Sequence, residues 1–194
     1  MTQVLTEVRA HLRGHFASDE PDTASVTFLG VERIEVLRFG PDAEGVYHYV
    51  SLGCSRHPMA DPTALAADPL HGPRAEVVVS LRDTVPTSGL ARTVALLAAT
   101  PAVDGVVLLP DALIDLGSPL WSGAPFTAVL LSTSGIPDLP LDSPRDPVTF
   151  LAATPVSANE AAWVRLKGVA AMRDAWLADG VDILDPRRPA AQPR

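Results

Sequence analysis

Hydrophobic residues recur at helical spacing in two stretches of the chain before its middle. In residues 2–16 the apolar side chains fall on one helical face and the charged ones elsewhere, with Thr2 placed to act as the N-cap. In residues 88–99 the same spacing brings Leu90, Val94 and Leu97 to one side. We therefore expect helices over both stretches, each burying one face.

A third helix is predicted near the end of the chain. Ser157 is followed by Glu160 at the third helical position, and this Ser-x-x-Glu pattern is the capping box that satisfies two amide donors at a helix start. Apolar residues continue to about residue 178, and Gly180 is a typical stop. We expect one helix over 158–178, with residues 186–194 as a flexible tail.

Short apolar runs between these stretches predict β-strands, and many prolines separate them. Residues 18–25 form a polar linker, and the strand from residue 148 is expected to end at Pro155, because proline lacks a ladder donor. The long connection 54–72 contains a short helical piece at 62–67. The expected strands are 26–29, 32–39, 46–52, 74–81, 106–109, 126–132 and 148–154. This order predicts a single α+β domain over residues 1–185, with a mixed or mostly antiparallel sheet flanked by helices.

Composition narrows the function classes. The 194 residues carry 23 acidic and 15 basic side chains, a net charge of −8, which disfavours nucleic acid as a partner. The N-terminus lacks the apolar core of a signal peptide, and no apolar run approaches the ~20 residues of a membrane span. The single cysteine excludes an intramolecular disulfide. We expect a cytoplasmic protein.

Candidate chemistry is sparse. His11 and His15 have metal-ligand spacing, but the HExxH pattern is absent, and no fourth ligand accompanies Cys54, His57 and His71. We therefore expect no metal and no cofactor. One alternative remains open, a small hydrolase or transferase in which Cys54 or Ser55 is activated by His57 or His48. A self-associating structural protein is another.

Three aromatic residues are candidate contacts for a protein partner. Tyr47 and Tyr49 share one face of the strand at 46–52, and Trp121 stands in a Gly/Pro/Ser-rich segment; exposed aromatics commonly anchor interfaces, although all three could instead complete the core. His57 and Asp61, in the long 54–72 connection, join them as predicted contact positions.

Four segments of the chain, in this order, resemble the suppressor-of-fused family in its short bacterial single-domain form. They are residues 46–55 (VYHYVSLGCS), 74–81 (RAEVVVSL), 147–160 (PVTFLAATPVSANE) and 180–189 (GVDILDPRRP). The resemblance implies a non-enzymatic protein-binding domain of mixed α/β structure. Bacterial members are thought of as immunity proteins that neutralise a partner toxin, so a toxin is the partner that the resemblance suggests. Residues 88–109 lack the Trp- and His-rich pattern of many members.

Overall fold

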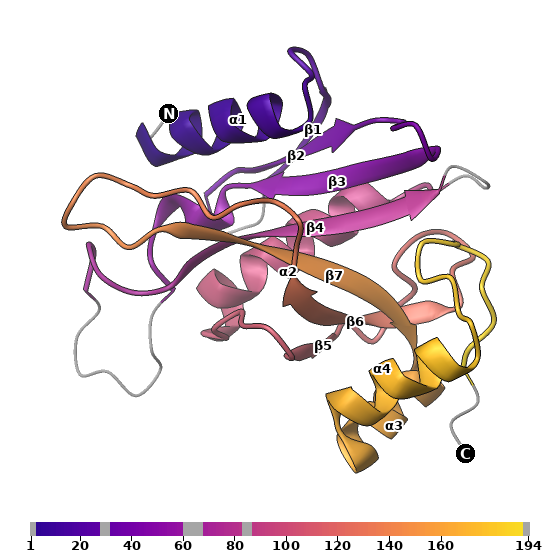
Figure 1. Cartoon of the computed structure of the whole chain (residues 1–194). Helices are drawn as coiled ribbons and strands as arrows, with labels where there is room; N and C mark the ends of the chain where they lie inside the picture. Colours follow the sequence, from indigo (N-terminus) through magenta and orange to yellow (C-terminus); the bar gives the residue numbers. More distant parts are fainter. Residues whose placement is uncertain (1–2, 28–31, 60–67, 83–86, 192–194) are drawn as a thin grey trace.

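The computed structural model of the chain describes residues 3–27, 32–59, 68–82 and 87–191, and these form one seven-stranded sheet with helices on both faces (Figure 1). The helices are α1 (Gln3–His15), α2 (Leu90–Asp104), α3 (Ala158–Lys167) and α4 (Val169–Ala178), with a short 3-10 turn η1 (Cys54–Arg56). The strands are β1 (Asp22–Val26), β2 (Ile34–Phe39), β3 (Val46–Leu52), β4 (Arg74–Arg82), β5 (Leu113–Asp115), β6 (Phe126–Thr133) and β7 (Val148–Ser157).

The sheet is mixed but mostly antiparallel, as predicted. Its strand order is β1-β2-β3-β4-β7-β6-β5, so β1 and β5 are its edges. Among the described strand pairs, only the central pair β4–β7 is parallel, with Arg74 opposite Val148. The parallel pair brings the first residues of two strands, 74 residues apart in sequence, to the same end of the sheet.

Alternation along the strands gives the sheet two buried faces. Val50 and Val78 are paired across β3 and β4 and pack under α1 with Val8. The next pair, Tyr49 and Val79, lies on the opposite face, which α2 covers. α3 and α4 cover Ala128, Leu130 and Val156, farther along the sheet from α1 (Figure 1).

Three of the strand predictions were wrong in whole or in part. Residues 106–109 are not a strand, and the polar segment 18–25 contains the start of β1. β7 also continues past Pro155 to Ser157. This is tolerated because β7 pairs with β4 only as far as Ala152, and the Pro155 carbonyl instead accepts a hydrogen bond from Arg188.

The predicted helix over 158–178 is two helices. Gly168, at φ 88° and ψ 168°, separates α3 from α4, a conformation that favours glycine. The capping box at Ser157 is confirmed, with both reciprocal hydrogen bonds to Glu160. The helix at 88–99 is also confirmed and extends to Asp104.

The expected flexible tail from residue 186 was wrong for the part that the structure describes. Arg188 is 3% exposed and Ala191 is 6% exposed, and both residues bond to Glu160. Thr2, Asp61 and the helical piece at 62–67 lie outside the described residues.

Candidate partner-binding surface

A buried carboxylate organises the turn where β3 leaves the sheet. Glu76 of β4 is fully buried and accepts four hydrogen bonds from this turn. The donors are the hydroxyls of Ser51 and Ser55 and the amides of Gly53 (2.8 Å) and Ser55 (3.0 Å). Gly53 itself, at φ 153°, lies so close to Ile34 that a side chain would crowd it. Glu76 therefore fixes the path of the chain from β3 into η1.

Arg74 binds the other side of the same turn. Its guanidinium donates to the carbonyls of Ser55 (2.9 Å), Arg56 (3.0 Å) and Pro69 (3.4 Å). Arg74 and Glu76, two residues apart in β4, thus satisfy the carbonyls and the amides of one turn between them.

A second buried network closes the C-terminal part of the chain. Glu160 accepts hydrogen bonds from Trp176 Nε1 (2.9 Å), Ala191 N (3.0 Å) and both terminal nitrogens of Arg188 (2.7 and 3.1 Å). Burial alone would raise the pKa of Glu160, but the Arg188 guanidinium and the other donors together hold it below its ordinary value. The carboxylate is therefore charged and fully paired.

These two networks explain the sequence segments that suggested a family. Ser51, Gly53, Ser55, Arg74 and Glu76 meet at one turn, and Ser157, Glu160 and Arg188 meet at the other site. The sequence contains a signal for them, because charged residues stand inside otherwise apolar strands and such residues need buried partners. Their pairing across the chain could not be read from spacing.

The geometry does not assemble the proposed nucleophile. The Ser55 hydroxyl is fully buried and donates to Glu76 at 2.6 Å, and burial followed by the charge of Glu76 raises the pKa of the Cys54 thiol well above its usual value. The His48 ring lies instead against Ser80 Oγ (2.9 Å) and Asp42 Oδ2 (3.3 Å). Among the described hydrogen bonds, none joins Cys54 or Ser55 to a histidine.

His11 and His57 each have a different neighbour. His11 Nε2 lies 2.8 Å from the Pro137 carbonyl, and the His57 ring is 70% exposed, with its Nε2 3.5 Å from Glu32. Within residues 3–27, 32–59, 68–82 and 87–191, no three metal-ligating side chains gather at one point. No helix in the described parts of the chain is long and apolar enough to cross a membrane.

The three aromatic candidates fall into different environments. Trp121 is 4% exposed and packs against Phe126 in the core beneath α2, so the expectation of an exposed anchor was wrong there. Tyr49 is half-buried, and its hydroxyl lies 3.2 Å from Thr87 Oγ1. Tyr47 is also partly exposed, and the guanidinium of Arg38 stacks 5.0 Å from the centre of its ring.

Tyr47 is connected to the edge of the sheet through Arg38. Arg38 in β2 donates to Asp22 in β1, and the side chains of both residues are exposed by more than a third. Asp22, Arg38 and Tyr47 therefore form a row across three strands, which we call the edge row. β1 itself is exposed along most of its length, and among the described strands it pairs only with β2 (Figure 1).

The sequence model of one family, described as suppressor of fused protein (SUFU), matches residues 30–189. A search of curated proteins finds no match. Similar solved structures include a SUFU homologue from Neisseria gonorrhoeae FA 1090, with a TM-score of 0.71 and 18% identity, covering 96% of each chain.

Two other similar structures are the Sufu–Fu complex and Drosophila Suppressor of Fused, each with a TM-score of 0.69 and 15% identity over 96% of this chain. The match covers 91% of the relative in the complex but only 50% of the Drosophila protein, so this chain spans half of the latter. These structures share the fold, and the family model covers most of the sequence. The chain belongs to the suppressor of fused protein family.

Proposed function

We propose that the chain is a non-enzymatic protein-binding module that acts in the cytoplasm as an immunity protein, neutralising a toxin by occluding it. The observation that carries the proposal is the exposed edge strand β1 beside the edge row. A relative of the same fold is found in the Sufu–Fu complex, which supports a protein as the partner.

An edge strand is a ready template for a partner's strand. No described strand pairs with the outer side of β1. A strand added to such an edge gains affinity from main-chain hydrogen bonds. β1 is five residues long, whereas the opposite edge, β5, has three. β1 therefore offers the longer docking edge.

The edge row supplies side chains next to this backbone. Tyr47 is an amphipathic, partly exposed ring of the kind enriched at interface centres, and Arg38 holds it in place. Tyr49, His57 and Asp61 remain proposed contacts. Trp121 is buried in the core that α2 covers, so we do not propose a direct contact for it. The net charge of −8 favours a basic toxin and predicts association that slows as salt rises.

Partner capture with matched edge variants tests the proposal. Successive residues of a strand direct their amides alternately toward the neighbouring strand and outward, so one of Thr23→Pro and Ala24→Pro removes only an outward donor. The proline variant that keeps wild-type stability in urea is the one to use as bait. This variant should fail to capture the stoichiometric, salt-sensitive partner from the native lysate, and so should Tyr47→Ala.

Lys167→Gln on α3, far from β1, is the control and should retain the partner (Figure 1). A partner that survives both the stable proline variant and Tyr47→Ala would contradict docking at β1. Toxin activity that the captured complex leaves intact would contradict the immunity role alone.

A further inference from the structure

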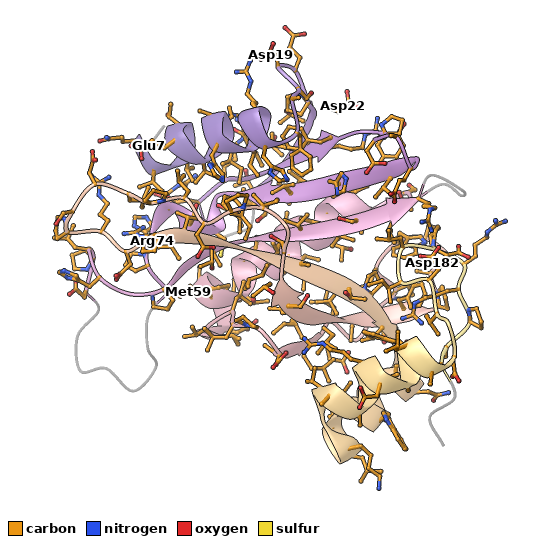
Figure 2. The ribbon with its side chains drawn as sticks, viewed as in Figure 1. Glu7, Asp19, Asp22, Met59, Arg74 and Asp182 are labelled. Carbon is orange, nitrogen blue, oxygen red and sulfur yellow. The ribbon has the colours of Figure 1, made fainter. Side chains whose placement is uncertain are left out.

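A cavity lies at the end of the sheet where β4 and β7 begin and β6 ends. Its volume is about 500 Å³, and Figure 2 shows Arg74, one of the residues that line it, near the start of β7. Most of its wall is apolar, formed by Leu108, Leu109, Pro110, Ile136, Phe150 and Leu151. A cavity of this size and character suits a small molecule or one long side chain of another protein, and its few polar groups select the occupant.

Two carboxylates belong to the wall of this cavity. Asp138 is exposed, and Asp146 is half-buried, with its Oδ2 accepting a hydrogen bond from the Gly72 amide at 2.6 Å. Among the residues that the structure describes, none forms an ion pair with either carboxylate. Because Asp138 is both exposed and part of the wall, a ligand in the cavity can reach its carboxylate directly.

The guanidinium of Arg74 is engaged on the other side of the wall. Its terminal nitrogens donate to the carbonyls of Ser55, Arg56 and Pro69, and the residue is only 3% exposed. Arg74 therefore supports the turn after β3 and does not offer these donors to a ligand. Two carboxylates against one guanidinium also leave the described wall with an excess of negative charge, which favours a cation.

The polar groups of the wall mainly accept hydrogen bonds. Pro73, Pro110 and Pro147 have no amide hydrogen, and the Thr149 hydroxyl already donates to the Arg74 carbonyl at 3.1 Å. A ligand that donates hydrogen bonds and carries a positive charge matches such a wall. A bare metal ion does not, because Mg²⁺ and Ca²⁺ take about six or more oxygen ligands and the described residues gather no three ligating side chains at one point.

We propose that this cavity binds a primary ammonium group carried on an apolar stem, with Asp138 as the acceptor of its hydrogen bond. The stem packs against Leu108, Leu109 and Ile136. This chemistry belongs to a free alkylamine and equally to a lysine side chain of another protein, and the test below distinguishes the two. The site goes beyond the proposed function, because two strands, β2 and β3, separate β1 from β4 in the sheet.

The test uses two matched pairs of probes on the whole ¹⁵N-labelled protein: hexylamine against hexanol, and acetyl-Leu-Lys-Leu amide against the same peptide with norleucine in place of lysine. Each ammonium probe should shift the amide signals of Leu108, Leu109 and Ile136. It should also bind about fivefold more tightly than its neutral match, which is the size expected of an exposed ion pair. Tighter binding of hexylamine assigns a free amine, and tighter binding of the peptide assigns a lysine side chain.

Asp138→Asn is the informative variant, because Asp138 is exposed and the change keeps the shape of the side chain. It should weaken the binding of each ammonium probe about fivefold and leave the neutral probes unchanged. Asp142→Asn is the matched control. Asp142 is exposed in the same β6–β7 connection and is not among the described residues of the wall, so the same loss of charge there should leave the preference intact.

A second pair of variants tests the apolar wall. Leu109→Ala should weaken ammonium and neutral probes alike, by about threefold, because the stem loses apolar contact. Leu177→Ala, at an exposed position on α4, is its control and should change nothing. Equal binding of ammonium and neutral probes, no binding at millimolar probe, or equal effects of Asp138→Asn and Asp142→Asn would overturn the proposal. None of these outcomes bears on capture of a partner at β1.

Discussion

The guanidinium of Arg188 bonds through both terminal nitrogens to the carboxylate of Glu160, 28 residues earlier, and both side chains are almost completely buried. The same guanidinium donates to the Pro155 carbonyl and stacks 4.8 Å from the Phe126 ring. One residue of the C-terminal segment thus ties together β6, β7 and the start of α3. The C-terminal segment is part of the fold.

Removing Arg188 should therefore destabilise the protein severely. Arg188→Met leaves the Glu160 charge buried without its partner, which typically costs about 3–5 kcal/mol of unfolding free energy. Urea unfolding measures the loss. The neighbouring Arg187→Met is the control, because Arg187 is exposed, and it should stay within about 0.5 kcal/mol of wild type.

A double variant separates the pair from general disruption. Adding Glu160→Gln to Arg188→Met removes the buried charge while keeping an oxygen for Trp176 and Ala191, so it should recover part of the stability. If the double variant lost as much unfolding free energy as the two single variants lose together, the two side chains would not interact.

The break at Gly168 makes a second prediction. Gly168→Ala should cost about 1–3 kcal/mol, because φ 88° and ψ 168° are strained for any residue with a side chain. No neighbouring atom lies within 4 Å of the added carbon, so the cost is purely one of backbone conformation. Thermal or urea unfolding gives the value.

Gly14 provides the opposite case within the same protein. It lies inside α1 with an ordinary helical backbone and equally open surroundings. Gly14→Ala should stabilise the protein by up to about 1 kcal/mol. Equal effects of the two substitutions would contradict the conformational explanation for the end of α3.

The carboxylate beneath the turn after β3 makes a third prediction. Glu76→Gln replaces one of two accepting oxygens with a donor that faces other donors, and we expect a loss of about 2–3 kcal/mol. Glu44→Gln, at an exposed position, is the matched control in the same urea experiment. A Glu76→Gln variant as stable as that control would mean that the turn does not depend on this carboxylate.

Local patterns in the sequence predicted the fold better than they predicted the site. The helix starting at Ser157 follows from the capping box, which is complete within four residues, and β3 follows from its own alternation. The break at Gly168 was missed because apolar residues continue on both sides of it. Whether a glycine ends a helix depends on what the next segment packs against, here Trp176 against the Glu160 network.

The site depended on long-range packing, which spacing does not encode. Trp121 stands in a Gly/Pro/Ser-rich segment typical of an exposed loop, yet the core beneath α2 encloses it. Arg188 lies in a polar C-terminal segment of the kind that is often frayed, yet its buried guanidinium bonds to Glu160. In both cases the partner is far away in sequence, and only the assembled sheet brings the two together.

The last prediction concerns mild acid. The pKa of His15 is lowered from 6.5 by its partial burial and then by the nearby His11 and His48. The unfolded chain therefore binds a proton more readily than the folded one, and stability rises with pH across this range. The contribution of His15 should be fully present above about pH 6.5 and lost as pH falls through the lowered folded value.

Urea unfolding between about pH 5 and pH 7 measures this contribution. The carboxylates whose pKa values the fold lowers, among them Glu160, have ordinary values of 4.5 or less and stay charged over this range. His15→Asn should flatten the decline of unfolding free energy toward pH 5 relative to wild type. An unchanged slope in this variant would show that His15 is not the group responsible. α1 ends at His15, and the ring of the next residue, Phe16, stacks on Phe39 of β2. A flattened slope would therefore place the acid sensitivity where the end of α1 packs against the sheet.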